Sequence, residues 1–437
     1  MDSVTTSSTA LLTDRYELTM LQATLANGTA ERHSVFELFA RRLSGGRRYG
    51  VVAGVGRALD AVADFRFGDA ELTWLREADV VDADTIAWLA DYRFSGTIWG
   101  YPDGEVYFPQ SPVMIVEGTF AECVILETVL LSILNHDSAI ATAAARMITA
   151  AGDRPCIEMG SRRTHEASAV AAARSAYIAG FAATSNLEAG RTYGIPTTGT
   201  SAHSFTLLHD TERDAFEAQI QALGPGTTLL VDTYDIPEAI RTAVDLAGDE
   251  LGGVRLDSGD LVSLARTVRQ QLDDLGAIQT RITVTSDLDE HAIAALAVAP
   301  VDGYGVGTSL VTGSGVPTSG FVYKLVSRAD DGGEMVSVAK KSQDKVSVGG
   351  RKHAVRRLTP AGRAQAEVIG VGTPPAHDAN DRPLLVELVR DGERVHTESL
   401  EDARARLKAS LAELPASARQ LSKADPAIDT IYEETPA

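Results

Sequence analysis

The chain has 437 residues, which is too long for one ordinary hydrophobic core and predicts two or three domains. Its formal net charge of −20 argues against nucleic acid or an anionic membrane as a partner, so any phosphate ligand must be held by local donors. The two cysteines, Cys123 and Cys156, are too few for a disulfide framework and indicate a reducing, cytoplasmic environment, where we expect them to fill the core.

Residues 1–10 are polar and rich in Ser and Thr, and we expect them to form a flexible tail. They lack a basic region followed by an apolar run, so no signal peptide is expected. No stretch approaches the ~18 uninterrupted apolar residues of a membrane helix. The composition therefore predicts a soluble protein that does not enter the membrane.

Residues 11–121 have the mixed pattern of an α/β domain. Asp14 can cap a helix over residues 15–26 that ends at Asn27-Gly28. Further on, we expect a strand over residues 35–40, helices within residues 51–96, and three short strands over residues 97–99, 106–108 and 113–116.

A long buried helix is expected after residue 122, with apolar residues every three or four positions and a break near Asn135-His136-Asp137. Seven short apolar runs then alternate with helical segments, a rhythm typical of parallel βα units. The runs cover residues 156–159, 182–185, 196–199, 228–232, 253–257, 282–286 and 302–305. We therefore predict an irregular (β/α) barrel of about seven parallel strands over residues 122–321, with function at the carboxyl ends of the strands.

Residues 322–437 return to short strands with polar turns and one amphipathic helix, and their Pro- and Thr-rich end looks frayed. The expected strands cover residues 321–327, 334–341, 353–358, 366–370 and 384–389, and the helix covers residues 398–412. The composition matches that of residues 11–121. We predict that both chain ends form one discontinuous α/β sandwich domain.

The ends of the seven predicted strands carry a consistent set of polar residues. Arg162, Arg163 and Arg255 suit planar oxyanions, because a guanidinium donates two parallel hydrogen bonds. Aspartates at the same rim suit Mg²⁺ carried by a pyrophosphate, and the Gly305–Thr308 sequence Gly-Val-Gly-Thr suits a 5′-phosphate.

Each of these features also has a purely structural explanation. Asp257 or Asp287 could cap a helix, the glycines could form an ordinary turn, and His203 could be satisfied at a strand-to-helix turn. Arg162-Arg163 could begin a solvated helix. The combination is harder to explain structurally, and it indicates a site for a sugar phosphate, a diphosphate and an acid.

Six motifs occur in the order found in nicotinate phosphoribosyltransferases, and over residues 11–326 the chain resembles that family. The motifs are Leu12-Thr13-Asp14-Arg15-Tyr16-Glu17-Leu18-Thr19-Met20, Gly160-Ser161-Arg162-Arg163, Gly199-Thr200-Ser201-Ala202-His203-Ser204, Asp232-Thr233-Tyr234-Asp235, Arg255-Leu256-Asp257-Ser258-Gly259-Asp260 and Gly305-Val306-Gly307-Thr308. The resemblance implies an irregular α/β barrel joined to a sandwich built from both chain ends. One departure is Ser286, at a strand end where many relatives have glycine.

The resemblance implies an ATP-stimulated transfer of phosphoribose from phosphoribosyl pyrophosphate to nicotinate, with Mg²⁺. His203 would be the phosphorylated histidine and, with Arg255, a catalytic residue. The other implied site residues are Tyr16, Thr200, Arg255 and Arg162 for nicotinate; Thr308, Gly307, Gly305, Asp287, Ser258 and Gly259 for phosphoribosyl pyrophosphate; and Asp257 and Asp260 for the metal.

Family members act as homodimers with the site near the subunit boundary, so Tyr16 is expected to act in its own or the partner's barrel. Three alternatives stay open from the sequence. They are a quinolinate phosphoribosyltransferase, a nicotinamide phosphoribosyltransferase and a non-catalytic nucleotide-binding relative.

Overall fold

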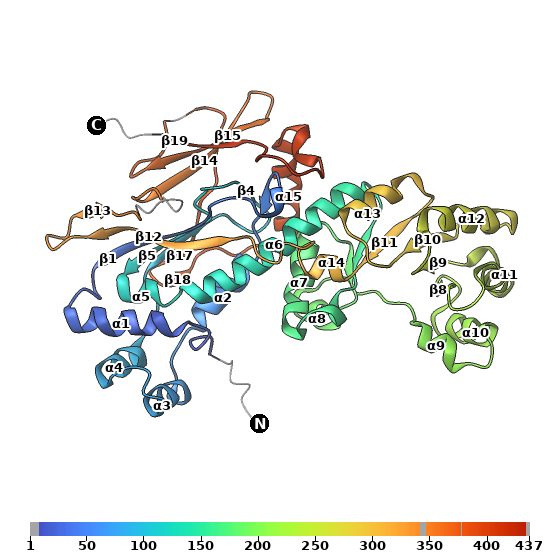
Figure 1. Ribbon diagram of the computed structural model, residues 1–437, viewed down its shortest axis with the longest axis horizontal. Helices are drawn as coiled ribbons and strands as arrows, with labels where there is room; N and C mark the ends of the chain where they lie inside the picture. Colours follow the sequence, from blue (N-terminus) through green and yellow to red (C-terminus); the bar gives the residue numbers. More distant parts are fainter. Residues whose placement is uncertain (1–7, 341–346, 377, 434–437) are drawn as a thin grey trace. The chain divides into compact units, whose positions relative to one another are not determined.

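The computed structural model describes residues 8–340, 347–376 and 378–433. The chain divides into two compact units. The first unit contains both chain ends, up to Ala139 and from Thr318, and the second contains Ile140–Pro317. Figure 1 shows the mainly antiparallel sheets of the first unit and the parallel sheet of the second. The first boundary, between Ala139 and Ile140, falls inside a helix, and the second lies between Pro317 and Thr318. The sequence suggested boundaries after residues 121 and 321.

Strands from both chain ends share the main sheet of the first unit. β1 (His33–Ala40) pairs antiparallel with β12 (Phe321–Ala329), and β3 (Thr97–Gly100) pairs with β17 (Val386–Arg390). The sheet has seven strands in the order β13-β12-β1-β5-β3-β17-β18. The predicted pairing of the tail strands with the first section is therefore confirmed. The other members are β5 (Met114–Thr119), β13 (Met335–Ser337) and β18 (Glu393–Arg394).

Two smaller sheets complete the strands of the first unit. One has four strands in the order β16-β14-β15-β19, and the other pairs β2 with β4. Their bounds are β2 (Gly50–Val51), β4 (Val106–Tyr107), β14 (Lys352–Leu358), β15 (Ala364–Val371), β16 (Asp381–Pro383) and β19 (Asp429–Glu433). The expected fraying of the C-terminal end is wrong for residues 429–433, because β19 pairs in parallel with β15. Residues 434–437 lie outside the described residues.

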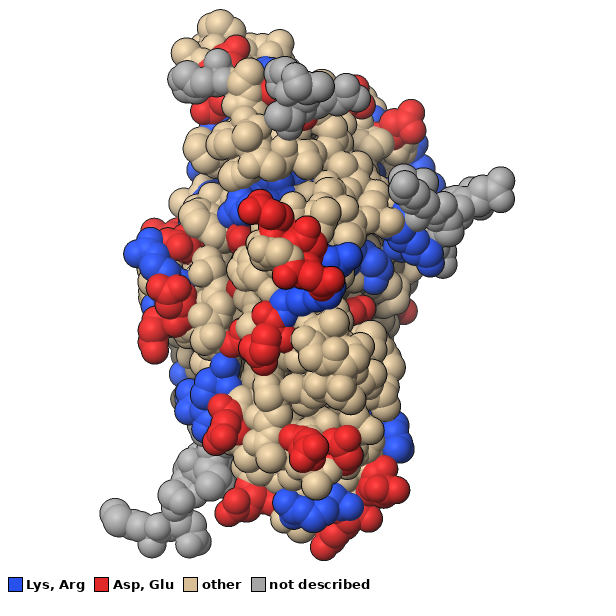
Figure 2. Space-filling view, turned by 90° about the vertical axis from the view of Figure 1, so that its left-hand side faces the viewer, with Lys and Arg blue, Asp and Glu red and all other residues tan. Residues whose placement is uncertain are grey.

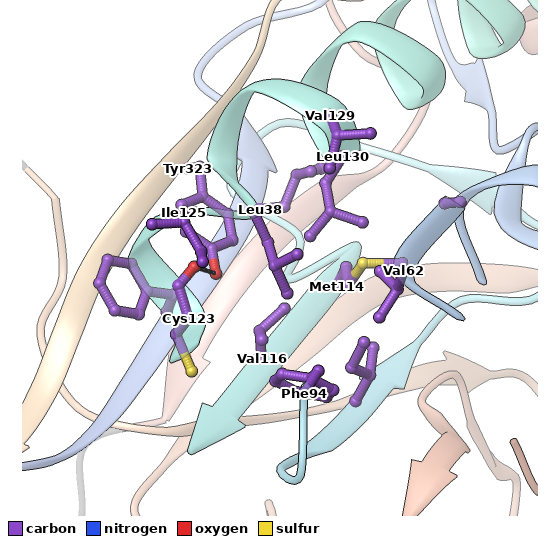
Figure 3. Packing of buried hydrophobic residues seen from close by; sticks show 14 of the residues in the cluster. Leu38, Val62, Phe94, Met114, Val116, Cys123, Ile125, Val129, Leu130 and Tyr323 are labelled. Carbon is purple, nitrogen blue, oxygen red and sulfur yellow. Dashed lines mark hydrogen bonds between the residues drawn. The ribbon is translucent and has the colours of Figure 1, made fainter. Parts of the chain in front are cut away.

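All but the last helix of the first unit contribute to one apolar core with the main sheet, and the last contacts β4 of the two-stranded sheet. They are α1 (Arg15–Asn27), α2 (Val55–Ala63), α3 (Asp69–Glu77), α4 (Ala83–Asp91), α5 (Phe120–Val124), the beginning of α6 (Glu127–Ala151) and α15 (Leu400–Glu413). Figure 3 shows Leu38 of β1 and Met114 of β5 near Leu130 of α6, and all three are fully buried. This burial, more than helix propensity, holds the short helices in place.

The N-terminal helix begins and ends where its sequence predicts. Asp14 occupies the N-cap position, although its side chain makes no capping hydrogen bond, and Gly28 ends the helix in the left-handed conformation. Residues 1–7 of the expected flexible tail lie outside the described residues. Ala10, at the end of that tail, is fully buried.

The break expected in the long helix near residues 135–137 is wrong, because α6 is continuous from Glu127 to Ala151. The polar residues that suggested a break are satisfied by distant partners. Asp137 is buried and accepts two hydrogen bonds of 2.8 Å from Arg57, and Asn135 Oδ1 accepts the Phe321 N–H at 2.8 Å. These residues therefore do not need to leave the helix to satisfy their polar groups.

The helical stretch Phe120–Ala151 is long and apolar enough to span a membrane by length and composition alone, among the described residues. However, 61% of its most apolar window is buried inside the molecule. This degree of burial is typical of the core helix of a soluble protein. On the face drawn in Figure 2, acidic and basic side chains lie in small, intermixed groups.

The second unit is a curled, half-barrel sheet of six parallel strands with helices between them. The strand order is β7-β6-β11-β10-β9-β8. The strands are β6 (Cys156–Glu158), β7 (Ala183–Thr184), β8 (Thr228–Leu230), β9 (Gly253–Leu256), β10 (Arg281–Val284) and β11 (Gly303–Val306). The helices are α7 (Glu166–Ile178), α8 (Leu187–Tyr193), α9 (His203–Leu208), α10 (Glu212–Leu223), α11 (Ile236–Ala247), α12 (Leu261–Asp274), α13 (Glu290–Ala295) and α14 (Thr308–Val311). In Figure 1, α10, α11 and α12 lie on one side of β8–β10.

The third predicted strand, residues 196–199, is reduced to a single parallel bridge between Thr184 and Thr197. Pro196 has no N–H to donate, and Gly199 packs no side chain, so this segment is a poor strand. The described residues therefore form six of the seven strands expected. The fold is α/β with a parallel half-barrel, as predicted in outline.

Candidate active site at the strand ends of the parallel sheet

A pocket of about 270 Å³ lies at the carboxyl ends of the parallel strands. Parallel strands bring their carboxyl ends to one edge of a sheet, so residues far apart in the sequence meet there. The pocket is lined by Met159, Arg162, Arg163, Arg255, Asp257, Thr285, Ser286, Asp287, Gly305, Gly307 and Thr308. Seven of the predicted site residues are thus brought together: Arg162, Arg255, Asp257, Asp287, Gly305, Gly307 and Thr308.

Three arginines give the pocket a cationic character in an otherwise acidic protein. Arg162 and Arg163 lie on a short 3₁₀ turn after β6 and are exposed, whereas Arg255 is partly buried on β9. Within the described residues, none of the three forms an ion pair with a carboxylate, while Asp257 and Asp287 supply the acidic groups. The arginines are therefore available to an anionic ligand.

Arg255 is held by one neutral partner. Its Nη1 donates to the hydroxyl of Thr200 at 2.6 Å, which joins two residues predicted to contact the same ligand. Burial lowers the pKa of Arg255, although Asp257 and Asp232 oppose this shift. Its Nε is buried without a hydrogen-bond partner in the described part of the chain. A guanidinium in this state gains from an incoming carboxylate.

His203 opens α9 and faces Asp232, whose side chain is only 2% exposed. The distance from His203 Nε2 to Asp232 Oδ1 is 3.1 Å. The other Asp232 oxygen accepts the N–H of Asp257 at 2.8 Å and the hydroxyl of Ser258 at 3.0 Å. Asp232 therefore fixes the imidazole and joins it to the end of β9. Among the described residues, His203 Nδ1 has no hydrogen-bond partner.

The two glycines after β11 have different surroundings. A Cβ on Gly305 would lie 2.6 Å from Thr285 Cγ2 and 2.7 Å from Met159 Sδ, so this glycine is required by packing. A Cβ on Gly307 would lie 3.4 Å from the Met159 carbonyl oxygen and 3.8 Å from its carbonyl carbon, which are ordinary contacts. Gly307 therefore leaves space at the pocket wall beside Thr308, where a ligand can approach the backbone.

Six predicted site residues do not line this pocket: Thr200 and His203, described above, and Ser258, Gly259, Asp260 and Tyr16. Ser258 and Gly259 lie beside it, with the Ser258 hydroxyl engaged by Asp232. Asp260 caps α12, since its carboxylate accepts the N–H and hydroxyl of Ser263 at 3.4 and 2.8 Å. Tyr16 lies in the first unit on α1 and is 45% exposed, and partial burial together with Glu127 raises its pKa. The helix-cap alternative was given for Asp257 or Asp287, but the caps of α12 and α13 are Asp260 and Asp289.

Sequence reasoning did not assign a role to Asp232 or Ser286, and it overlooked Glu212. The sequence shows Asp232 as a carboxylate at a strand end. Its contact with His203 could not be predicted, because the two residues are 29 positions apart in the chain. Glu212 begins α10, and burial raises its pKa to about 7, with Asp235, Asp232 and Glu238 adding to the shift. No local pattern marks it, because the shift depends on tertiary neighbours.

The pocket fits a metal that is carried by its ligand better than a metal held by protein alone. Within the described residues, no group of three or more His, Cys, Asp or Glu side chains is placed to hold an ion. Asp257 and Asp287 nevertheless both line the pocket. One or two carboxylates together with phosphate oxygens are a usual set of Mg²⁺ ligands.

Comparisons with known proteins point to one family. A family model described as the nicotinate phosphoribosyltransferase N-terminal domain matches residues 11–135. Nicotinate phosphoribosyltransferase pncB1 of Mycobacterium tuberculosis (strain CDC 1551 / Oshkosh) is 57% identical over 96% of this chain and 94% of its own length. The Bacillus subtilis (strain 168) nicotinate phosphoribosyltransferase is 39% identical over 80% of this chain and 73% of its own. The crystal structure of human nicotinic acid phosphoribosyltransferase matches with a TM-score of 0.83 at 26% identity, covering 97% of this chain and 98% of that one.

Proposed function

This chain belongs to the nicotinate phosphoribosyltransferase family, and we propose that it transfers phosphoribose from 5-phosphoribosyl 1-pyrophosphate to nicotinate. The products are nicotinate mononucleotide and pyrophosphate, in the biosynthesis and salvage of NAD. The observation that carries the proposal is the set of three pocket arginines without carboxylate partners among the described residues, beside the open wall at Gly307. Both substrates are anions, and such a pocket suits them.

Arg255 and Thr200 form the proposed binding site for the nicotinate carboxylate, with Arg162 nearby in the same pocket. The guanidinium of Arg255 has an unpaired Nε and suits two parallel hydrogen bonds to a carboxylate. Tyr16 is the fourth residue proposed to contact nicotinate. Its exposure on α1 leaves its ring available to a ligand, in the same subunit or in a partner.

The ring nitrogen of nicotinate uses its lone pair to form the bond to C1 of the ribose, while the bond from C1 to the pyrophosphate oxygen breaks. The nitrogen has no proton to lose, so the reaction needs no general base. The chain's contribution is to position the two reactants and to stabilise the charge that develops on ribose and pyrophosphate. The pocket arginines and aspartates are suited to both tasks.

The Gly305–Thr308 segment and Asp287 are proposed to bind phosphoribosyl pyrophosphate, with Ser258 and Gly259 at the edge of the site. Asp257 and Asp287 would provide oxygens to Mg²⁺ carried by the diphosphate, whereas Asp260 is occupied as a helix cap. The cation would neutralise charge on the leaving pyrophosphate.

ATP is proposed as a second substrate that phosphorylates His203. Asp232 holds Nε2 of the imidazole, and Nδ1 has no partner among the described residues, so Nδ1 is the proposed acceptor of the γ-phosphoryl group. The Nδ1 lone pair forms the bond to phosphorus as ADP leaves. Asp232 stabilises the cationic character of the ring, much as an aspartate orients histidine in other phosphoryl or acyl transfers.

The remaining parts of the proposal concern assembly and location. We propose a cytoplasmic homodimer with the site near the subunit boundary, and a barrel whose seventh strand is the segment at residues 196–199. The same proposal treats residues 11–121 with 322–437 as the sandwich domain and residues 122–321 as the barrel domain. β1 from the N-terminal part of the chain pairs with β12 from the C-terminal part, which supports placing both chain ends in one domain.

The direct test incubates the protein with phosphoribosyl pyrophosphate, Mg²⁺ and each of nicotinate, nicotinamide and quinolinate, and measures mononucleotide and pyrophosphate. We expect turnover of nicotinate, stimulated by ATP. Turnover of quinolinate or nicotinamide in preference to nicotinate would overturn the assignment. Absence of turnover with all three would indicate a non-catalytic relative.

The His203→Ala variant tests the role of ATP. We expect it to lose ATP hydrolysis and acid-labile labelling from γ-labelled ATP, while basal transfer without ATP remains. His209→Ala is a suitable control, because His209 lies on the same segment but its Nδ1 contacts the Phe205 carbonyl, whereas His203 faces Asp232. Equal labelling of wild type and His203→Ala would exclude His203 as the acceptor.

A further inference from the structure

Glu158 is a fully buried carboxylate at the end of β6 that the proposed reaction does not use. Its side chain is 0% exposed, and it precedes the turn that carries Arg162 and Arg163. Burial raises the pKa of Glu158, and hydrogen bonds from Thr184 and Gly160 oppose that shift without help from any cation in the described part of the chain. Burying a carboxylate without a cation is unfavourable, so its hydrogen bonds need an explanation.

The two oxygens of Glu158 accept donors from different segments. Oε1 accepts the N–H of Gly160 and Oε2 accepts the hydroxyl of Thr184, both at 2.5 Å. Thr184 lies on β7, is aligned with Glu158 across the parallel sheet, and is 1% exposed. One carboxylate thus joins the start of the arginine turn to the neighbouring strand.

Two further hydrogen bonds close this network into a ring. The Thr184 hydroxyl oxygen accepts the N–H of Asn186 at 2.9 Å, and Asn186 Nδ2 donates to the Ser161 hydroxyl at 2.9 Å. Ser161 follows Gly160, so the ring returns to the turn immediately before Arg162. The members of a closed network support one another, because losing one contact leaves the next group without its partner.

The backbone of the turn determines where its two arginines point. Arg162 and Arg163 are exposed, and the N–H of Arg163 donates back to the Gly160 carbonyl at 2.8 Å. Gly160 itself is tightly packed, since a Cβ there would lie 2.2 Å from Val311 Cγ1 and 3.0 Å from Glu158 Oε1. The hydrogen bond from Gly160 to Glu158 therefore sets the direction in which the turn leaves β6.

The same ring also reaches the partner of the third pocket arginine. The Thr184 N–H donates to the Pro196 carbonyl at 3.0 Å, and the Thr184 carbonyl accepts the N–H of Thr198 at 3.0 Å. This segment continues to Thr200, whose hydroxyl accepts from Arg255 Nη1 at 2.6 Å. All three arginines of the pocket are thus connected to the contact between Glu158 and Thr184.

We propose that Glu158 is a positioning residue, which together with Thr184 holds the pocket arginines in the arrangement that binds anionic substrates. Glu158 does not line the pocket, so it acts through the arginines and not on the substrate itself. This inference rests on the proposed function for the identity of the substrates and adds a residue outside the pocket to it.

Two variants break the contact from opposite sides. Glu158→Gln keeps the size of the side chain but has one acceptor oxygen, so it cannot accept from both donors. Thr184→Val keeps the shape but removes the hydroxyl. By isothermal titration, each should weaken binding of inorganic pyrophosphate and of nicotinate about tenfold, equal to about 1.4 kcal/mol. Thr184→Ser restores the hydroxyl and should bind both probes within about twofold of wild type.

Steady-state kinetics separate positioning from a purely structural role. Misplaced arginines should raise the KM for nicotinate about tenfold and leave kcat within about threefold of wild type. A purely structural role would reduce the amount of folded enzyme, which lowers the apparent kcat and leaves KM unchanged.

The control is Glu290→Gln, which changes another buried carboxylate of the second unit. Glu290 accepts from Arg146 Nε at 3.0 Å and from the Ser314 hydroxyl, and it does not line the pocket. This variant should lose stability but keep the affinity for both probes.

Unchanged affinity for both probes in Glu158→Gln and Thr184→Val would overturn the positioning role, and so would equal losses of affinity in Glu290→Gln. A wild type that binds pyrophosphate but does not convert nicotinate would contradict the proposed function alone, because the pyrophosphate titration still decides the role of Glu158. A wild type that does not bind pyrophosphate would contradict both.

Discussion

Arginines serve opposite purposes in the two units of this molecule. In the first unit, Arg356 is fully buried, and its guanidinium contacts Glu105 at 2.9 Å and Glu367 at 2.5 Å. In the second unit, Arg255 shares the pocket with Arg162 and Arg163, and none of the three has a carboxylate partner among the described residues. Arginines paired within the protein stabilise its fold, whereas unpaired arginines at a pocket are available to a ligand.

The carboxylates differ between the units in the same way. Burial alone would raise the pKa of Glu105, but Arg356 and Arg382 lower it to about 2. Glu212 in the second unit has no such partner, and burial with nearby Asp235 and Asp232 raises its pKa to about 7. The same side-chain type is thus stabilised as an anion in one unit and destabilised as an anion in the other.

The largest effect on stability is expected from Arg356→Ala. The substitution leaves Glu105 and Glu367 buried without their shared cation, which should lower the free energy of unfolding by about 3–5 kcal/mol. Denaturant unfolding of the variant and of Arg394→Ala makes the comparison. Arg394 pairs with Asp60, the two side chains are 37% and 67% exposed, and the loss of this pair should cost about 1 kcal/mol or less. Equal losses in both variants would mean that the buried pairs are not the stabilising feature.

A smaller, pH-dependent effect is expected from Glu212→Gln. The folded pKa of about 7 lies above the ordinary value of 4.5, so the folded state holds a proton that the unfolded state releases between these pH values. The associated stability is fully present below pH 4.5 and is lost as pH rises through 7. At pH 8 the glutamine variant should therefore be more stable than wild type by about 1 kcal/mol, after allowance for partial solvent exposure.

Thermal unfolding at pH 5 and pH 8 tests this expectation. At pH 5 the wild-type side chain is largely protonated, so the two proteins should unfold at similar temperatures. A stability difference that is the same at both pH values would show that Glu212 acts through packing instead of through its charge.

Local sequence patterns predicted those parts of the fold that depend on neighbouring residues. The helix at residues 15–26 ends at Gly28 as expected, because the left-handed cap is a local requirement. The break in α6 was wrongly expected because the partner of Asp137 is Arg57, 80 residues away. The pairing of β19 with β15 was missed for the same reason, since parallel pairing leaves no hairpin signal.

The site was predicted in the same uneven way. Arg255, Asp257, Asp287 and Thr308 follow strand ends, and parallel topology brings them into one pocket. Asp260 stands three residues beyond Asp257, but the start of α12 turns its carboxylate into a cap. Ser286 has a φ of 124°, set by the hydrogen bond of Thr285 to Leu256 and the burial of Leu288, which composition and periodicity do not reveal.

The measurement that tests the comparison most directly is the ratio of kcat/KM for nicotinate to kcat/KM for nicotinamide, in wild type and in Arg255→Ala. Nicotinamide lacks the charge and places an NH₂ donor against the guanidinium. Leaving a buried Arg unpaired costs on the order of 3–5 kcal/mol, which implies discrimination of roughly 10²–10³-fold or more. We expect the ratio to fall by about this factor in Arg255→Ala, with the affinity for phosphoribosyl pyrophosphate nearly unchanged. Arg255→Lys should also lose most nicotinate turnover, since lysine keeps the charge but lacks the planar guanidinium that donates two parallel hydrogen bonds. An unchanged ratio in a folded variant would contradict the account and move recognition of the acid to Arg162 or Arg163.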